Sequence, residues 1–243
     1  MAFAEKLNIK DLPANQAYVF IADQQTQGYG VASGSKWVSP LGNLYFTICM
    51  SAKKESVLKN ALHYPQVTAL AVVQTLSHFG VDQRAKLQMK FVNDVFLNDK
   101  KVCGVLSRLE SMGDSFKLMI GIGVNLNTLP PHYPDLQSAT SVLIETKQRT
   151  NLQHFSEILT QNIINLFKVL DAEGFGKSIH QSIHDRMYML GEEVKIYERN
   201  LKEVTLQGVF ERLNEDGTVT IRDKSGVKHI INDGRMRSLD FEP

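Results

Sequence analysis

The sequence predicts an α+β fold, with a larger domain of a mixed sheet and helices over residues 1–188 and a small β-barrel over residues 189–243. Two observations predict this. Before about residue 189, strand-like apolar runs alternate with long amphipathic helical stretches, whereas after it short strands follow one another with Gly-containing turns between them. A chain of 243 residues, 43% of them hydrophobic, is also long enough for one sizeable core and a small second one.

The elements of the larger domain can be placed in order. Apolar residues at spacings of three and four predict helices, and apolar or alternating runs predict strands. Helices are expected over 2–12, 65–79 and 155–170, and strands over 18–22, 44–50, 87–91 and 117–127. We expect the strand over 18–22 to be buried because its residues are apolar on both faces. In the barrel, strands are expected over 193–197, 204–212, 218–222 and 227–231.

Composition excludes several classes of partner. The net charge is +1, and no basic stripe with interleaved aromatic residues is found, so nucleic acid is not expected as a partner. No apolar run has the length of a membrane span and the first residues do not read as a signal peptide, so we expect no membrane partner and a cytoplasmic location. Cys49 and Cys103 lie in apolar runs, which favours buried thiols. His180 and His184 lack a third ligand nearby, so no metal site is expected.

The stretch 90–106, KFVNDVFLNDKKVCGVL, contains a predicted hairpin. Two short apolar strands flank a polar Asn-Asp-Lys-Lys turn. Lys101 opens the second strand, and Gly104 removes a side chain where a ligand or another backbone could approach. A cationic tip beside bare backbone suits an anionic ligand, although these residues alone also fit an ordinary hairpin with solvated lysines.

Two further stretches carry candidate site residues. Residues 25–40, QTQGYGVASGSKWVSP, combine glycines with small polar residues, which is typical of a loop that surrounds an anion or of a plain surface loop. Trp37, the only tryptophan, is either a core plug or a pocket wall. Residues 120–127, IGIGVNLN, form the end of a buried strand, in which Asn125 serves either packing or ligand contact.

These three motifs, in this order, resemble the catalytic domain of biotin protein ligases. That family carries a QTxGRGR-type loop ending in Trp-x-Ser-Pro, a KWPND run followed by K-x-x-G, and a GxGxN strand. The likeness extends over about residues 2–237, and three spaced motifs are far more specific than one. The matching residues are Gln25, Thr26, Gly28, Gly30, Trp37, Ser39, Pro40, Lys90, Asn93, Asp94, Lys101, Gly104, Gly121, Gly123 and Asn125.

The resemblance implies a fold of the class II aminoacyl-tRNA synthetase and biotin ligase type, followed by an SH3-like barrel. It implies an ATP-dependent ligase that forms biotinyl-5'-AMP and transfers biotin to a lysine of a biotin carboxyl-carrier protein, or of the carrier domain of a biotin-dependent carboxylase. ATP, biotin and Mg²⁺ would be its small-molecule requirements, and a homodimer is one expected state.

The resemblance also implies roles for individual residues. Lys101 and Lys90 would be the catalytic lysines, with Lys101 against the biotin carboxylate and the α-phosphate. Contacts to biotin or the adenylate are implied for Gln25, Thr26, Gly28, Tyr29, Gly30, Val31, Trp37, Asn93, Asp94, Gly104, Val105, Asn125 and Arg237.

The chain departs from the family pattern in two places. The loop reads Gly28-Tyr29-Gly30-Val31 where the family has Gly-Arg-Gly-Arg, so a weaker hold on the adenylate is expected. The family's N-terminal strand and Ser-Thr-Asn loop have no counterpart. No DNA-binding domain precedes the motifs, so we expect a monofunctional ligase without repressor function. A lipoate or octanoate transferase of the same fold, or a non-catalytic relative that binds biotin or nucleotide, are the alternatives.

Overall fold

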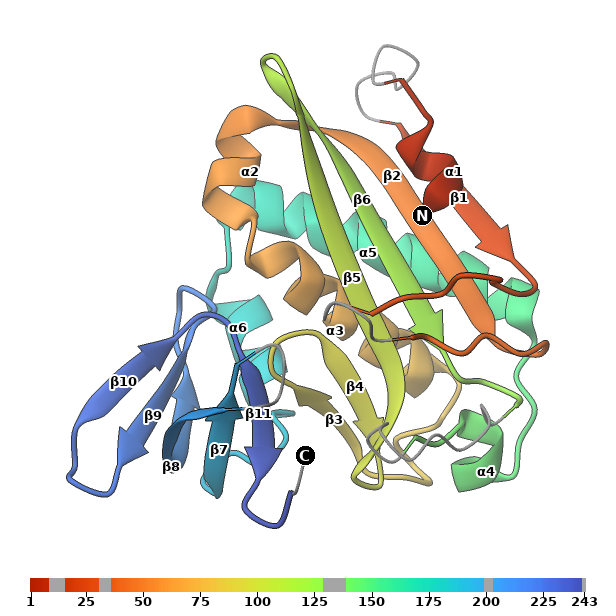
Figure 1. Ribbon diagram of the computed structural model, residues 1–243. Helices are drawn as coiled ribbons and strands as arrows, with labels where there is room; N and C mark the ends of the chain where they lie inside the picture. Colours follow the sequence, from red (N-terminus) through yellow and green to blue (C-terminus); the bar gives the residue numbers. More distant parts are fainter. Residues whose placement is uncertain (9–15, 31–35, 129–138, 199–202, 242–243) are drawn as a thin grey trace.

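The fold consists of two antiparallel sheets with helices packed against the larger one (Figure 1). It is taken from a computed structural model, which describes residues 1–8, 16–30, 36–128, 139–198 and 203–241. The larger sheet has the strand order β1-β2-β6-β5-β4-β3. Its strands are β1 (Ala17–Ala22), β2 (Leu44–Lys53), β3 (Leu87–Lys90), β4 (Asp94–Leu97), β5 (Lys100–Met112) and β6 (Ser115–Val124). The predicted α+β class is confirmed, but the strands of the larger sheet pair antiparallel where a mixed sheet was expected. Among the described residues, parallel pairing occurs only in two isolated bridges.

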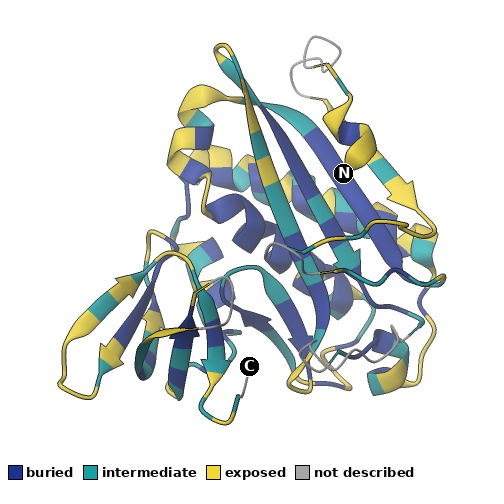
Figure 2. Ribbon diagram, in the orientation of Figure 1, coloured by how far each residue is buried: buried dark blue, intermediate teal, exposed yellow. Residues whose placement is uncertain are grey.

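Helices cover one face of the larger sheet and bury its core (Figures 1 and 2). The predicted helices over 65–79 and 155–170 are confirmed as α3 (His63–His78) and α5 (Leu152–Glu173). The remaining helices are α1 (Ala2–Glu5), α2 (Lys54–Asn60), α4 (Val142–Thr146) and α6 (Lys177–His184). Within the described part of the chain, no helix is both long and apolar enough to cross a bilayer.

The opposite face of the larger sheet is where the glycines of the motifs lie. Side chains alternate along β6, so Ile120 and Ile122 enter the core while Gly121 and Gly123 lie on the other face. Gly104 of β5 is paired with Gly123 across the strands, which leaves a stretch of sheet without side chains. We call Gly104, Gly121 and Gly123 the glycine face. Parts of the segment between β1 and β2 cross in front of it (Figure 1).

The second sheet has the order β10-β9-β8-β7-β11. Its strands are β7 (Glu193–Tyr197), β8 (Val204–Leu213), β9 (Val219–Asp223), β10 (Lys228–Ile231) and β11 (Arg235–Ser238). The four predicted strands of this region are confirmed, and β11 was not predicted. Among the described residues β10 and β11 lie at opposite edges, so the sheet is open where a closed barrel was expected.

Hydrogen bonds hold the second sheet, and the segment between α6 and β7, against the larger domain. Beside β3, the Met89 N–H donates to the Arg186 carbonyl over 2.7 Å, and the Tyr188 N–H donates to the Met89 carbonyl over 2.7 Å. At the start of α3, Gln66 Nε2 donates to the Gly217 carbonyl over 2.7 Å in the turn before β9. β11 lies beside β3 and β4 (Figure 1).

Two predictions about the N-terminal elements are wrong. Residues 18–22 do form a strand, but β1 is an edge strand that pairs only with β2, and Ile21 is 56% exposed where burial was expected. An apolar run cannot reveal that its strand lies at the edge of a sheet. The first helix ends at Glu5, and it presents Ala4 to the sheet while Phe3 is exposed. The rest of its expected span, residues 9–12, lies outside the described residues.

Candidate active site

The predicted hairpin over 93–102 is confirmed as β4 and β5. Its turn consists of Asn98 and Asp99, whose φ angles of 47° and 63° are tolerated by these two residue types. Lys101 is the second residue of β5, and its Nζ lies 2.7 Å from Asp94 Oδ1 on β4. Both side chains are about one-quarter exposed or less, so the pair is partly buried and remains accessible.

Trp37 covers two of the three residues of the glycine face, Gly104 and Gly123, and Met1 lies against the third, Gly121. A Cβ placed on Gly123 would lie 2.5 Å from Trp37 Cε2, and one placed on Gly104 would lie 3.1 Å from Cζ3. Lys101 Nζ lies 5.6 Å from the centre of the indole. The indole is therefore packed on the sheet face opposite the core, beside the lysine. Of the two readings of the sequence, this position fits a pocket wall.

Gly123→Ala should displace the Trp37 indole. The new methyl group would overlap the ring, and overpacking of this kind typically costs about 1 to 3 kcal/mol of stability. Since Trp37 is the only tryptophan, a shift in its fluorescence emission reads the displacement directly. Gly113→Ala, where a Cβ meets nothing within 4 Å, is a control for substitution as such, although its positive φ adds backbone strain. An unchanged emission spectrum in Gly123→Ala would contradict the packing described here.

We call residues 25–40 the glycine loop. Hydrogen bonds join its described parts to each other beside Trp37. The Trp37 N–H donates to the Gly28 carbonyl over 2.9 Å, and a side chain at Gly28 would collide with the Trp37 carbonyl oxygen. Gln25 Nε2 donates to Ser39 Oγ over 3.1 Å, and Ser39 Oγ donates to the Trp37 carbonyl over 3.1 Å. The loop therefore places Gln25 and Trp37 relative to each other.

The other loop residues of the prediction are less confined. Thr26 is exposed, Gly30 is partly buried, and Tyr29 is 50% exposed with its hydroxyl 3.4 Å from Glu5 Oε1 on α1. Tyr29 therefore points toward α1. Val31 lies outside the described residues.

Lys90, at the end of β3, is almost completely buried. It is 2% exposed, and its Nζ has no hydrogen-bond partner among the described residues. The amine lies 5.2 Å from the centre of the Phe96 ring. Burial, and then the positive charge of Arg237, hold the pKa of Lys90 well below its usual 10.5. An anion bound here would supply the missing partner.

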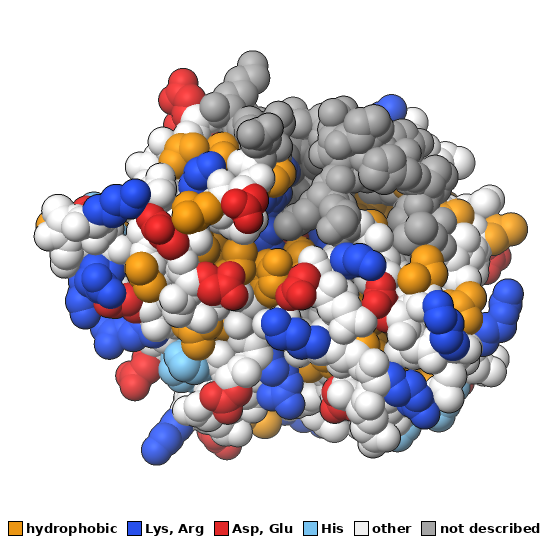
Figure 3. Space-filling view, turned by 90° about the horizontal axis from the view of Figure 1, so that it is seen from below, with side chains coloured by type: hydrophobic (Ala, Val, Ile, Leu, Met, Phe, Trp, Pro, Cys, Tyr) orange, Lys and Arg blue, Asp and Glu red, His pale blue; other side chains and the backbone are white. Residues whose placement is uncertain are grey.

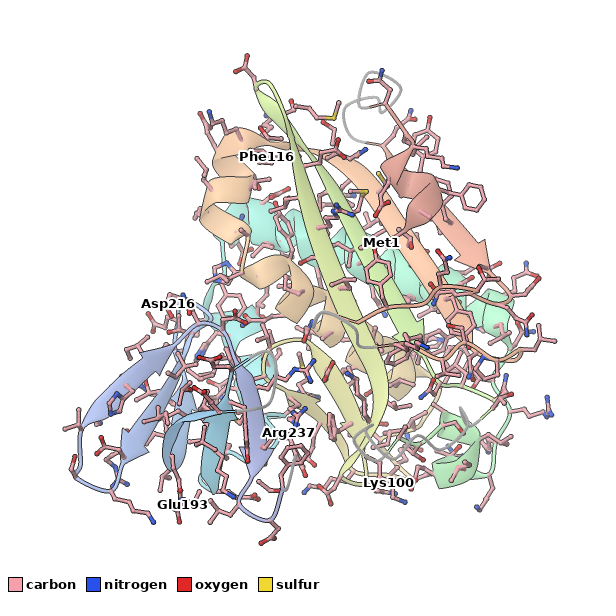
Figure 4. All side chains as sticks on the ribbon, viewed as in Figure 1. Met1, Lys100, Phe116, Glu193, Asp216 and Arg237 are labelled. Carbon is pink, nitrogen blue, oxygen red and sulfur yellow. The ribbon has the colours of Figure 1, made fainter. Side chains whose placement is uncertain are left out.

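Arg237 lies on β11 (Figure 4), close enough to Lys90 for its charge to act on the buried amine. Its guanidinium lies 5.0 Å from the Phe241 ring, and its Nε has no partner in the described part of the chain. Burial, followed by the charge of Arg235, lowers the pKa of Arg237 to about 10. Asp94 is the carboxylate whose charge acts on Lys90 and on both arginines.

We call Lys90, Lys101, Arg235 and Arg237 the cation cluster. Four cations around Asp94 leave an excess of positive charge where the two sheets meet, which favours a polyanionic ligand. Arg235 was not among the predicted site residues. The signal was present in the alternation Arg235-Met236-Arg237, because a strand places its first and third residues on one face.

The predicted asparagines and Val105 lie around the hairpin. Asn125 Nδ2 donates to the Thr140 carbonyl over 3.1 Å, while its buried Oδ1 has no partner among the described residues. Asn93 Nδ2 donates to the Val105 carbonyl, which holds the start of β4 against β5 within the hairpin. The Val105 side chain itself belongs to the core, so only its backbone borders the site.

Four buried polar atoms without a partner in the described chain come from residues that the sequence predicted for the site. Such atoms are uncommon in proteins, and each marks a place where a ligand or water can bind. They come from the glycine loop, the strand before the hairpin, the Gly-rich strand and β11, which the fold brings together. The atoms are Trp37 Nε1, Lys90 Nζ, Asn125 Oδ1 and Arg237 Nε.

One face of the molecule carries charges of both signs. In the view from below, Lys and Arg side chains are interspersed with Asp and Glu (Figure 3).

Comparisons with known proteins agree with this geometry. A sequence model described as "Biotin/lipoate A/B protein ligase family" matches residues 2–125, more than half of the chain. The biotin–[acetyl-CoA-carboxylase] ligase of Paracoccus denitrificans is 29% identical over 227 residues, which cover 92% of this chain and 91% of that protein. The bifunctional ligase/repressor BirA of Bacillus subtilis is 32% identical over 125 residues, which cover 50% of this chain and 36% of that protein.

The fold is likewise similar to solved structures. The biotin protein ligase from Aquifex aeolicus in complex with biotin and ATP has a TM-score of 0.78 and 28% sequence identity, over 97% of this chain and 92% of that one. The apo structure of the Aquifex enzyme has a TM-score of 0.73 and 26% identity, over 92% of this chain and 90% of that one. The chain therefore belongs to the biotin/lipoate A/B protein ligase family.

Proposed function

We propose that this chain is an ATP-dependent biotin protein ligase that forms biotinyl-5'-AMP and then biotinylates a lysine of a carrier protein. The observation that carries the proposal is the cation cluster beside the glycine face, because the first step must hold a carboxylate and a triphosphate together against their repulsion. The similarity to the Paracoccus and Aquifex ligases, whose names specify biotin, favours biotin over lipoate or octanoate.

In the first step, an oxygen of the biotin carboxylate attacks the α-phosphorus of ATP. The bond from that phosphorus to the bridging oxygen breaks, and pyrophosphate leaves with the electron pair. In the second step, a lysine ε-amine of the carrier attacks the acyl carbon, AMP leaves, and the amine loses its proton to solvent. Neither step requires an acid-base residue of unusual pKa, so positioning and charge neutralisation are the main tasks of the protein.

In this proposal, different residues of the cation cluster bind different reacting groups. Lys101 lies between the biotin carboxylate and the α-phosphate, where a point charge with rotatable donors suits a changing geometry. Lys90, Arg237 and Arg235 together bind the β- and γ-phosphates and the departing pyrophosphate. Asp94 keeps Lys101 at the mouth of the pocket until the substrates bind.

The glycine face and its cover bind the remaining parts of biotinyl-5'-AMP. Biotin lies beside the Trp37 indole, which is itself packed on Gly104 and Gly123, and is bordered by Gln25. Asn125 contacts the nucleotide side through its free Oδ1, and Asn93 keeps the hairpin in place. The remaining loop residues, Thr26, Gly28, Tyr29, Gly30 and Val31, close over the adenylate.

Mg²⁺ enters as part of the nucleotide substrate. Mg²⁺ is usually held by one or two carboxylates together with substrate phosphates, and Asp94 is available beside the proposed phosphate site. The described residues contain no group of three His, Cys, Asp or Glu side chains that could hold the ion without the phosphates. The protein residues therefore fit MgATP better than a resident metal ion.

A carboxyl-carrier protein, or the carrier domain of a biotin-dependent carboxylase, is the proposed acceptor. A homodimer, a cytoplasmic location and a domain boundary between residues 188 and 189 remain predictions from the sequence. The weaker hold on the adenylate predicted from Tyr29 and Val31 also stays a prediction.

The test is a transfer assay with MgATP and an isolated carrier domain, run with biotin, lipoate and octanoate in parallel. Biotin should give pyrophosphate release and one added biotin per carrier, whereas the other two acids should give neither. Transfer of lipoate or octanoate alone would replace the proposal by the second activity of the family. Binding of biotin without pyrophosphate release would indicate a non-catalytic relative.

A further inference from the structure

Glu145 on α4 is a nearly buried carboxylate outside the predicted site. Its Oε1 accepts from Thr140 Oγ1 over 2.6 Å and lies 3.4 Å from Lys100 Nζ, and its Oε2 accepts from Asn98 Nδ2 over 2.6 Å. The side chain is 9% exposed. Burial alone would raise the pKa of Glu145, but the hydrogen bonds from Thr140 and Asn98 and the charge of Lys100 outweigh it and lower the pKa. The group is therefore a carboxylate at neutral pH.

Thr140 connects this carboxylate to two residues of the proposed site. Its N–H donates to the Lys101 carbonyl over 2.9 Å, and its carbonyl accepts from Asn125 Nδ2 over 3.1 Å. Thr140 is 1% exposed, so these bonds are shielded from water. The backbone of Thr140 therefore connects the Lys101 carbonyl to the Asn125 side-chain amide, beside the direct bond from the Asn125 N–H to the Val102 carbonyl over 2.8 Å.

The other side of Glu145 holds the hairpin turn. Asn98 has a positive φ. The Lys86 N–H donates to Asn98 Oδ1 over 2.9 Å, which fixes the orientation of the Asn98 side chain. Asn98 Nδ2 is then free to donate to Glu145. Lys100, next to Lys101, adds its charge from the same turn. The Glu145 carboxylate thus contacts the hairpin turn through Asn98 and Lys100, and it is connected to the Lys101 backbone through Thr140.

We propose that Glu145 is a positioning residue for the first chemical step, which holds the hairpin turn and Thr140 together and so fixes Lys101 relative to Asn125. The inference rests on the proposed ligase function, whose first step needs Lys101 at a fixed distance from the α-phosphate. Displacement of a reacting group by about 1 Å can slow a reaction about a hundredfold, so a loss of one anchor should be visible in the rate constant.

Glu145→Gln tests the proposal with little change of shape. Glutamine replaces one acceptor oxygen by an NH₂ group. Turned toward Asn98, this group faces a donor; turned toward Thr140, it forces the hydroxyl to accept instead of donate and leaves Lys100 without its acceptor, so the connection is weakened in either orientation. In single-turnover experiments with excess enzyme, MgATP and limiting biotin, the rate constant of biotinyl-5'-AMP formation should fall about tenfold. The amplitude should stay that of the wild type. A fall in the rate constant reports slower chemistry, because the rate constant does not depend on the fraction of folded protein.

Thr140 supplies a matched pair of variants. Thr140→Val keeps the shape and removes the hydroxyl, and it should slow adenylate formation as Glu145→Gln does. Thr140→Ser keeps the donor and should restore most of the rate. The double variant Glu145→Gln/Thr140→Val should be no slower than Glu145→Gln alone, since both changes break one connection.

Glu157→Gln is the control for loss of a negative charge. Glu157 lies on α5 with a 59% exposed side chain, and its partners, Gln153 and His154, are on the same helix. The rate constant of this variant should equal that of the wild type. An equal rate constant in Glu145→Gln, or a reduced amplitude with an unchanged rate constant, would overturn the positioning role.

Hydrogen exchange gives a second readout that requires no activity. In Glu145→Gln the Thr140 amide, which donates to Lys101, should exchange at least about tenfold faster than in the wild type if the anchor is lost. Unchanged exchange would refute the inference. A wild-type protein that releases no pyrophosphate, together with faster exchange in the variant, would refute the proposed function and leave the anchoring by Glu145 intact.

Discussion

Lys101→Ala should slow biotinyl-5'-AMP formation by about a hundredfold while the protein remains folded. Removing one charge aimed at the developing negative charge of a transition state typically raises the barrier by about 3 kcal/mol. The Lys101 side chain is partly exposed at the mouth of the pocket, so its loss leaves the core unchanged. The measurement is the single-turnover rate of pyrophosphate release, with thermal unfolding followed in parallel.

Lys86→Ala is the matched control for Lys101. Lys86 is also a lysine near the hairpin, with its Nζ 3.5 Å from Asp99 Oδ1, but both side chains are more than half exposed. Exposed pairs of this kind contribute about 0 to 1 kcal/mol, so neither rate nor stability should change measurably. A Lys101→Ala variant that releases pyrophosphate at the wild-type rate would assign the hairpin to an ordinary surface role.

Lys90→Met should stabilise the free protein and weaken nucleotide binding. A buried amine without a hydrogen-bond partner costs about 1 to 3 kcal/mol, and methionine fills similar volume without that cost. If Lys90 binds the phosphates, loss of its charge-assisted hydrogen bond should raise the KM for ATP about ten- to a hundredfold. Urea unfolding and steady-state kinetics measure the two effects. A variant that is less stable than the wild type would show that the amine has a partner in solution.

The pH dependence of this stability difference follows from the lowered pKa of Lys90. Between that lowered pKa and the usual value of 10.5, the unfolded chain binds a proton at Lys90 that the folded protein does not. The folded state therefore gains stability from this group as the pH rises through the window. The advantage of Lys90→Met over the wild type should shrink toward alkaline pH and be largest below the window. A difference that does not depend on pH would contradict burial of the charged form.

The sequence was most informative where function and local structure use the same residues. The hairpin was predicted because Asn98 and Asp99 are turn formers between apolar runs, and both adopt the positive φ that such a turn requires. Gly104, Gly121 and Gly123 were each predicted to leave room for a ligand or another backbone, and the pairing of Gly104 with Gly123 places two of these gaps side by side. Both signals are encoded within a few neighbouring positions.

What the sequence did not predict depends on contacts between distant segments. The exposure of β1 follows from its place at the sheet edge, which an apolar run does not report. The strand β11 is four residues long and polar at three of them, too weak a pattern to detect alone. Glu145 acquires its role only because α4 packs beside a turn 47 residues earlier in the chain. No local pattern indicates that proximity.

The contacts of the C-terminal sheet also limit how far the protein could be shortened. A fragment that ends at residue 188 would keep Lys90 and Lys101 but lose Arg235 and Arg237, half of the cation cluster. It would also expose the face of α3 that binds the turn at Gly217, leaving Gln66 without its acceptor. The bonds at Met89 would survive, because their partners, Arg186 and Tyr188, precede the cut. A chimaera that exchanges this sheet for a relative's must therefore bring an acceptor for Gln66 and cations in place of the two arginines.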